Sequence, residues 1–273
     1  MQCYVSKRIE LNKMIITGGL GLVIAAGLYY AVKYRQRIVT RDFLKSVPLN
    51  DRMKMKFEPK RYDLTAKIDA NTIVYPGDPP FEAETVAEVG AEDSHFKLCK
   101  LSFSNHMGTH IDYPRHVLSD GATSEAYTIN DHIKNGVIIE VPNELRSINR
   151  DFVSQYPNLH DQIVMFKTAN SQLSKHEAYT SDYVYIEPDA AEYLVEQEVA
   201  MVGIDYISVD PDTAHDLPTH NMLLSNGVLI VENLELKAVP AGDYKIYVFP
   251  LNVRHADGVP ARVMAEQRMQ QFC

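Results

Sequence analysis

The chain has 273 residues, of which 45% are hydrophobic and 23% charged, and its net charge at pH 7 is −9. This composition is ordinary for a folded protein with one large domain or two small ones. The acidic charge argues against a nucleic-acid-binding protein. Cys3, Cys99 and Cys273 are odd in number and far apart, which argues against a disulfide framework and a thiolate zinc site. We therefore expect free thiols in a reducing compartment.

An uncharged run of 19 residues, 14–32, begins after a short N-terminal tail, residues 1–13. It is long enough to cross a membrane as a helix, and tyrosines gather at its C-terminal end. We expect a transmembrane anchor over residues 14–34, with a basic juxtamembrane linker over 35–56. A cleaved signal peptide followed by secretion is the alternative. Because the positive charge is heavier after the run, the main domain is expected in the cytoplasm.

Residues 57–273 carry no second linker and no repeat, so we expect one domain there. Two helices are predicted, from about Pro188 to Gln197 and from about Pro218 to Ser225, each with proline in its first turn. Many strands and few helices predict an α/β domain with a mixed, largely antiparallel β-sheet. The strand-like runs are Ile73–Tyr75, Lys97–Phe103, Gly136–Val141, Gln162–Phe166, Tyr183–Ile186, Val199–Ile204, Val228–Val231 and Lys245–Phe249.

The segment HMGTHIDYPRH, from His106 to His116, holds three histidines and one aspartate in 11 residues. Such side chains suit zinc, manganese or iron. In a straight strand, His106 and His110 would lie roughly 13 Å apart. They could not then share one ion through ligand bonds of about 2.1 Å. Gly108 permits the backbone bend that such a site requires.

Two residues further along the chain could complete this site. His220 lies early in the second predicted helix, and Glu232 ends the apolar run 228–231. A carboxylate is costly to bury beside such a run unless it is paired or binds a metal. The alternative interpretation is a surface histidine and an exposed glutamate at the end of a strand.

The pattern HxGTHxDxPxH is met at every fixed position from His106 to His116. It resembles the signature of the metal-dependent cyclase family, which includes bacterial-type kynurenine formamidase and isatin hydrolase. The resemblance covers about residues 60–265 and leaves the N-terminal region outside. Weaker blocks in the family's order support it, at residues 62–65, 75–81, 203–210, 217–220, 232–234, 249–251 and 256–262.

The resemblance implies a set of side chains for one or two divalent ions, zinc or manganese: His106, His110, Asp112, His220 and Glu232. Where two ions bind, Asp112 would bridge them. His116 matches the catalytic proton carrier. Tyr75 stands where kynurenine formamidases commonly have a tryptophan that stacks on the substrate, so it is a candidate substrate-binding residue.

The implied activity is hydrolysis of a small aryl amide by metal-bound hydroxide, with His116 as the proton shuttle. N-formylkynurenine is the first expected substrate, and kynurenine and formate would be its products, in tryptophan degradation. A hydrolase of a cyclic aryl amide or a lactone is the first alternative. An inactive, membrane-tethered binding protein is the second. Family members are commonly dimers or tetramers, so a homo-oligomer is expected.

Overall fold

The computed structural model describes residues 59–91, 94–176 and 178–267. They belong to one compact unit, Pro59–Cys273. The predicted anchor over residues 14–34 and the linker over 35–56 lie outside the described residues and stay predictions. Within the described part, no helix has both the length and the apolar character that a membrane crossing requires.

An eight-stranded sheet forms the body of this unit, in the order β1-β12-β11-β5-β7-β9-β10-β4, and a further β4–β12 pairing closes it into a barrel. Parallel pairings join β5, β7, β9 and β10, and the remaining pairings are antiparallel. The strands are β1 (Arg61–Asp63), β4 (His110–Asp112), β5 (Ile133–Glu140), β7 (Ile163–Lys167), β9 (Met201–Ile204), β10 (Leu229–Glu232), β11 (Gly242–Pro250) and β12 (Gly258–Gln267).

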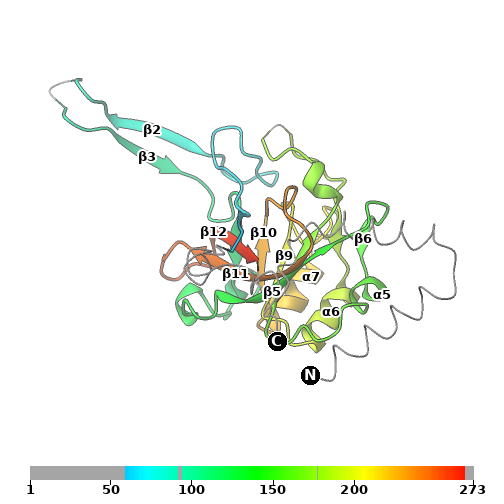
Figure 1. Ribbon diagram of the computed structural model, residues 1–273. Coiled ribbons are helices and arrows are strands. Elements are labelled where there is room, and N and C mark those ends of the chain that lie inside the picture. Colours follow the sequence, from blue (N-terminus) through cyan, green and yellow to red (C-terminus); the bar gives the residue numbers. More distant parts are fainter. Residues whose placement is uncertain (1–58, 92–93, 177, 268–273) are drawn as a thin grey trace, which may run out of the picture. The chain divides into compact units, whose positions relative to one another are not determined.

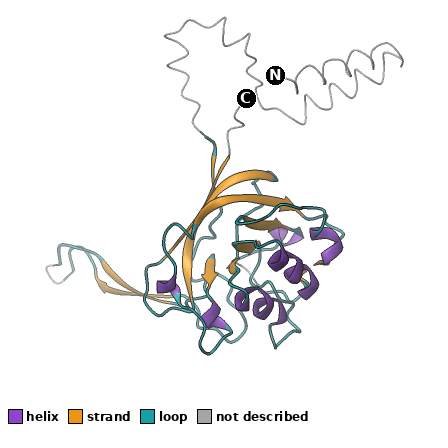
Figure 2. Cartoon of the chain, turned by 90° about the horizontal axis from the view of Figure 1, so that it is seen from below, coloured by secondary structure: helices purple, strands orange, loops and turns teal. Residues whose placement is uncertain are grey.

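Three helices pack against one another along one side of the sheet (Figure 1, Figure 2). They are α5 (Arg150–Val153), α6 (Pro188–Glu196) and α7 (Pro218–Ser225). Consecutive residues of β7 alternate between two cores: Val164 and Phe166 face the helices, whereas Ile163 and Met165 face the barrel interior. Because both faces of this strand are buried, its first four residues, 163–166, are all apolar.

The remaining elements are short. β6 (Ser147–Ile148) and β8 (Tyr185–Ile186) form a small parallel pair, and three 3-10 turns occupy Pro114–His116, Ser124–Ala126 and Ala169–Gln172. β2 (Glu82–Ala87) and β3 (Leu98–Ser102) form a two-stranded arm that extends away from the barrel (Figure 1).

Both predicted helices are present, and the mixed, largely antiparallel sheet with few helices is confirmed. The strand predicted at Ile73–Tyr75 is wrong. Ile73 instead donates its backbone N–H to the carbonyl of Lys175, which lies in a loop, and its side chain packs beside Tyr206. The apolar run there reflects burial under loops rather than strand pairing.

Candidate metal centre and active site

The site lies where β4 and β10 pair. In this antiparallel register, Glu232 of β10 stands directly opposite His110 of β4, and Ile230 stands opposite Asp112. His110 and Asp112 share one face of the strand because they are two residues apart. All three polar side chains are almost completely buried, so this seam of the barrel carries a charged cluster inside the protein.

Two glycines allow His106 to join this cluster. Gly108 has a φ of 63°, in the left-handed region that glycine adopts without strain, and it turns the chain between His106 and His110. Gly258 of β12 lies under the ring of His106, where a Cβ atom would come within 2.3 Å of the ring carbon Cε1. The predicted bend at Gly108 is therefore present. A side chain at position 258 would displace the histidine.

Helix α7 supplies His220. The carboxylate of Asp210 accepts hydrogen bonds from the first backbone N–H groups of the helix, those of Thr219 at 2.8 Å and His220 at 3.0 Å. The same carboxylate lies 2.6 Å from the Nδ1 atom of His220. It therefore holds the helix start and the imidazole together. This leaves the Nε2 atom of His220 directed at the cluster, 3.3 Å from Glu232 Oε1.

Asp112 is the centre of this cluster and is wholly buried. Nitrogen atoms of three rings surround its carboxylate, at 2.7 Å for His106, 3.4 Å for His110 and 3.8 Å for His220. Neither oxygen has a hydrogen-bond partner of acceptable geometry. Buried polar atoms without partners are rare and costly. The donor set of imidazoles and carboxylates suits zinc or manganese, so the residues fit the predicted metal.

The pKa values of the histidines in this cluster also indicate that the buried carboxylates require positive charge beside them. Burial by itself lowers the pKa of His110, but the carboxylates of Asp112 and Glu232 hold that pKa well above its usual value. Burial likewise opposes the charge on His220, yet Asp210 and Glu232 raise its pKa to about 10. Bound divalent cations would supply the charge that protons supply here, and their binding would release those protons.

His116 lies beside this cluster, at the end of the 3-10 turn Pro114–His116. Its ring centroid is 4.2 Å from that of His106, and its Nδ1 atom is 3.5 Å from Asp257. Burial, together with the neighbouring histidines, lowers its pKa. His116 therefore differs from His110 and His220, because its surroundings favour the neutral imidazole that can accept a proton.

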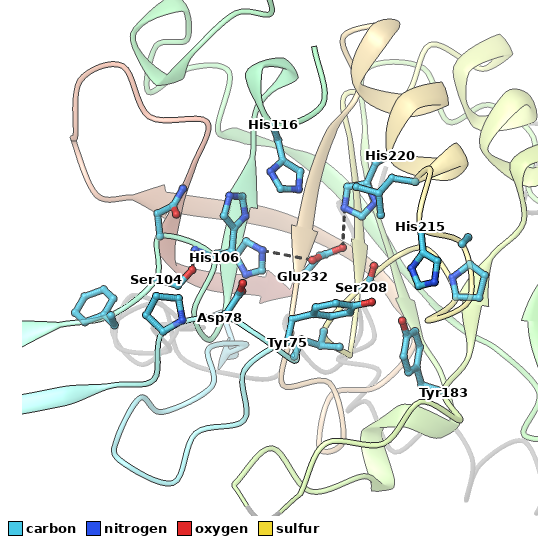
Figure 3. Close-up of a pocket in the computed structure, with 18 residues that line it drawn as sticks. Tyr75, Asp78, Ser104, His106, His116, Tyr183, Ser208, His215, His220 and Glu232 are labelled. Atoms are coloured by element: carbon cyan, nitrogen blue, oxygen red, sulfur yellow. Dashed lines mark hydrogen bonds and ion pairs between the residues drawn. The ribbon is translucent and has the colours of Figure 1, made fainter. Parts of the chain in front are cut away.

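A cavity of 770 Å³ opens directly onto the cluster. Figure 3 shows His106, His116, His220 and Glu232 gathered at one end of this cavity, with Tyr75 and Tyr183 further along it. Phe103 also lines the cavity. Tyr75 makes an edge-to-face contact with Tyr179 at 5.8 Å, and its hydroxyl lies 3.3 Å from Asp212. Aromatic side chains thus surround the space next to the cluster.

All six polar residues named from the sequence meet at one place, and Tyr75 lines the same cavity. No role was predicted from the sequence for Asp210, Asp257, Phe103 or Tyr183. Asp210 and Asp257 fall inside sequence blocks that matched the family, but nothing in their spacing indicates a histidine as partner.

The family is settled by comparison with known proteins. The Cyclase family model matches residues 62–211. A kynurenine formamidase of Salinibacter ruber is 30% identical over 202 residues, which cover 74% of this chain and 95% of that protein. The chain belongs to the Cyclase family.

Solved structures agree with this family. The structure described as a predicted metal-dependent hydrolase from Bacillus stearothermophilus is 32% identical, with a TM-score of 0.66 over 77% of this chain and 98% of that chain. Isatin hydrolase A from Labrenzia aggregata has a TM-score of 0.67 at 21% identity, over 76% and 93% of the two chains, and shares the fold.

Some residues in and beyond the Cyclase motif connect strands of the barrel by hydrogen bonds. Thr109, inside the motif, is buried, and its hydroxyl accepts the N–H of Ala66 at 2.8 Å and donates to the carbonyl of Asn233 at 2.6 Å. Arg262 of β12 pairs with Asp63 of β1. Thr109 thus links the segment before β4 to the segments after β1 and β10, and the Arg262–Asp63 pair links β12 to β1.

Proposed function

We propose that this chain is a metal-dependent amide hydrolase that cleaves a non-peptide C–N bond, with N-formylkynurenine as its first substrate. One observation carries the proposal: the buried Asp112 carboxylate has no hydrogen-bond partner and stands among three imidazoles at the end of an aromatic cavity. The relatives named kynurenine formamidase, at about 30% identity, support the choice of substrate.

Five side chains would hold one or two ions, and Asp112 would serve both where two bind: His106, His110, Asp112, His220 and Glu232. A divalent ion held by these residues would lower the pKa of a water molecule toward neutrality and would stabilise charge on the substrate carbonyl oxygen. Asp210 orients His220 through its Nδ1 atom, and Asp257 lies 3.0 Å from Nε2 of His106. Such supporting carboxylates fix the ring positions of ligand histidines.

His116 would carry the proton. Its Nδ1 atom faces Asp257, which leaves Nε2 to accept a proton from the attacking water. The water oxygen bonds to the formyl carbon, the C–N bond breaks, and His116 returns the proton to the departing aryl nitrogen. The products are formate and the aryl amine. The aromatic walls would hold the ring of the substrate in place during these steps.

A second candidate substrate is a cyclic aryl amide such as isatin. Along the cavity, within the part of the chain that is described, the lining includes Asp78 but no lysine or arginine. N-formylkynurenine carries an α-ammonium group and a carboxylate, and lysine or arginine commonly binds such a carboxylate, whereas isatin carries no charge. A neutral ring needs no basic partner in this lining, and this observation supports isatin as the second candidate.

The deciding experiment combines metal analysis with hydrolysis assays. The purified protein is expected to contain one or two equivalents of zinc or manganese, to lose activity on treatment with a strong chelator, and to regain it when either metal is added back. The ratio of kcat/KM for N-formylkynurenine to that for isatin then identifies the substrate class. Full activity in metal-free protein, or no hydrolysis of either compound by the metal-loaded protein, would contradict the proposal.

Tyr75 provides a test of substrate binding. Its ring lines the cavity beside Tyr179, and an aromatic stack contributes about 0.5–1.5 kcal/mol beyond burial of area. Tyr75→Ala is therefore expected to raise KM by roughly tenfold, since about 1.4 kcal/mol corresponds to one decade. Tyr75→Phe, the matched control, keeps the ring and is expected to change KM little. Metal content should be unchanged in both variants, and a loss of metal would assign Tyr75 a different role.

A further inference from the structure

A single segment after β9 forms one wall of the catalytic cavity. The residues of this segment that line the cavity are Ile207, Ser208, Pro211, Ala214, His215 and Leu217. The segment is fixed at the end next to the metal cluster. Val209 donates its N–H to Glu232 Oε1 at 2.8 Å, and the carboxylate of Asp210 lies 2.6 Å from the His220 ring. This wall therefore has a set position relative to the predicted metal ligands.

Asp212 lies in the same wall, two positions beyond Asp210, and its carboxylate contacts two tyrosines. Its Oδ1 atom accepts hydrogen bonds from the hydroxyl of Tyr75, at 3.3 Å, and from the hydroxyl of Tyr179. Hydrogen bonds to a charged acceptor are roughly twice as strong as neutral ones. Burial, together with Asp212, raises the pKa of both tyrosines, so their hydroxyls keep the protons that they donate. One carboxylate thus joins side chains from two different loops.

The two tyrosine rings also contact each other. Their centroids lie 5.8 Å apart with the ring planes at 72°, which is an edge-to-face contact. Of Tyr75, Tyr179 and Asp212, Tyr75 alone lines the cavity (Figure 3). Its 3.3 Å hydrogen bond is long for two oxygen atoms. The ring of Tyr75 is therefore supported mainly by the ring of Tyr179, which Asp212 holds.

Further contacts attach the loop of Tyr179 to the segment after β9. Thr180 donates its N–H to the hydroxyl of Tyr206 at 3.1 Å. Tyr183 donates its hydroxyl to the carbonyl of Asp210 at 2.8 Å. Tyr183 and Tyr206 are buried and belong to one hydrophobic cluster. Because the loop is held at these points as well, loss of the carboxylate should release the ring of Tyr179 without unfolding the loop.

We propose that Asp212 is a positioning residue for substrate binding: it holds Tyr179 against Tyr75 and so fixes the ring of Tyr75 relative to the metal cluster. The inference rests on the proposed function, because it takes the substrate to carry an aryl ring that the ring of Tyr75 contacts. Asp212 stands behind the cavity lining and outside the predicted ligand set. It should therefore determine the affinity for an aryl ring and leave the metal content and the proton transfer unchanged.

The first test measures hydrolysis of formanilide, an uncharged aryl formamide, by the full-length, metal-loaded protein. Asp212→Ala is expected to raise KM by about fivefold, within the range of one aromatic contact, and to change kcat by less than about twofold. Asp212→Asn keeps the acceptor oxygen and should restore most of the affinity. The matched control, Asp216→Ala, removes the same charge from an exposed residue of the same segment and should behave as wild type.

A second set of variants tests whether Asp212 acts through the tyrosines. Tyr179→Phe removes the hydroxyl and keeps the ring, so it should raise KM as much as Asp212→Ala does. It also keeps the test valid if Asp212→Ala fails to fold. In a Tyr75→Ala background, Asp212→Ala should have no further effect on KM, because no ring is left to position. Additive effects of Tyr75→Ala and Asp212→Ala would overturn the proposal.

Binding of benzamide, measured by calorimetry, separates this inference from the proposed function. Benzamide carries an aryl ring and an amide but no formyl group, so its binding does not depend on turnover. Wild type is expected to bind it about fivefold more tightly than Asp212→Ala does. That result in a protein that hydrolyses no aryl amide would contradict the proposed function and support the role of Asp212. Equal affinity in the two proteins, or no binding by wild type, would overturn the role of Asp212 whatever the activity.

Discussion

Asp112→Asn is expected to remove the bound metal and to reduce kcat/KM by more than about 10³-fold. The change keeps the size of the side chain but removes the charge of a buried carboxylate, the one among the described residues whose two oxygens lack hydrogen-bond partners. The carboxylate of Asp112 is the negative group that the rings of His106, His110 and His220 surround. Without its charge, these residues no longer form a site that attracts a cation. Metal per folded chain, measured by mass spectrometry, and kcat/KM should fall together.

The matched control is Asp205→Asn. Asp205 is also wholly buried, but it accepts hydrogen bonds from Thr168 and Ser171, away from the cluster. Asp205→Asn should lower the thermal stability and leave the metal content of the folded protein unchanged. An Asp112→Asn protein that retains its full metal content would show that the carboxylate is not a ligand.

His116→Ala is expected to keep most of the metal and to lose about 10²–10⁴-fold in kcat, which is the usual contribution of general acid–base catalysis. The structure makes this test informative, because a ring nitrogen of His116 lies within 4.8 Å of ligand atoms of His106 and Asp112. A ligand role is therefore the competing interpretation. If His116 moves the proton, imidazole added to the His116→Ala protein should restore part of the activity.

His110→Ala is the comparison for this variant. It removes a residue that lies 3.4 Å from both Asp112 and Glu232, so metal and activity should be lost together and imidazole should not rescue the enzyme. Equal loss of metal from His110→Ala and His116→Ala would assign His116 to the ligands instead of to proton transfer.

The sequence by itself determined the local features of the site. His106 and His110 can share one ion only if the chain bends between them, and Gly108 bends it with a positive φ. The sequence also marked α7, because Pro218 and the Asn226-Gly227 pair are strong local signals for the start and end of a helix. Such features depend on residues close in the chain.

The tertiary structure decided the features that depend on pairing between distant parts of the chain. β1, β4 and β12 were not predicted, because they are short or contain glycine, proline and charged residues. Pairing with other strands holds them in the sheet, and the β4–β12 pairing closes the barrel. The same closure places Asp257 beside His106, although 151 positions separate them. The arm was visible only as the run Lys97–Phe103, which was expected inside the sheet. Strand propensity specifies an extended backbone, but long-range contacts decide which strand it pairs with and which side is left uncovered.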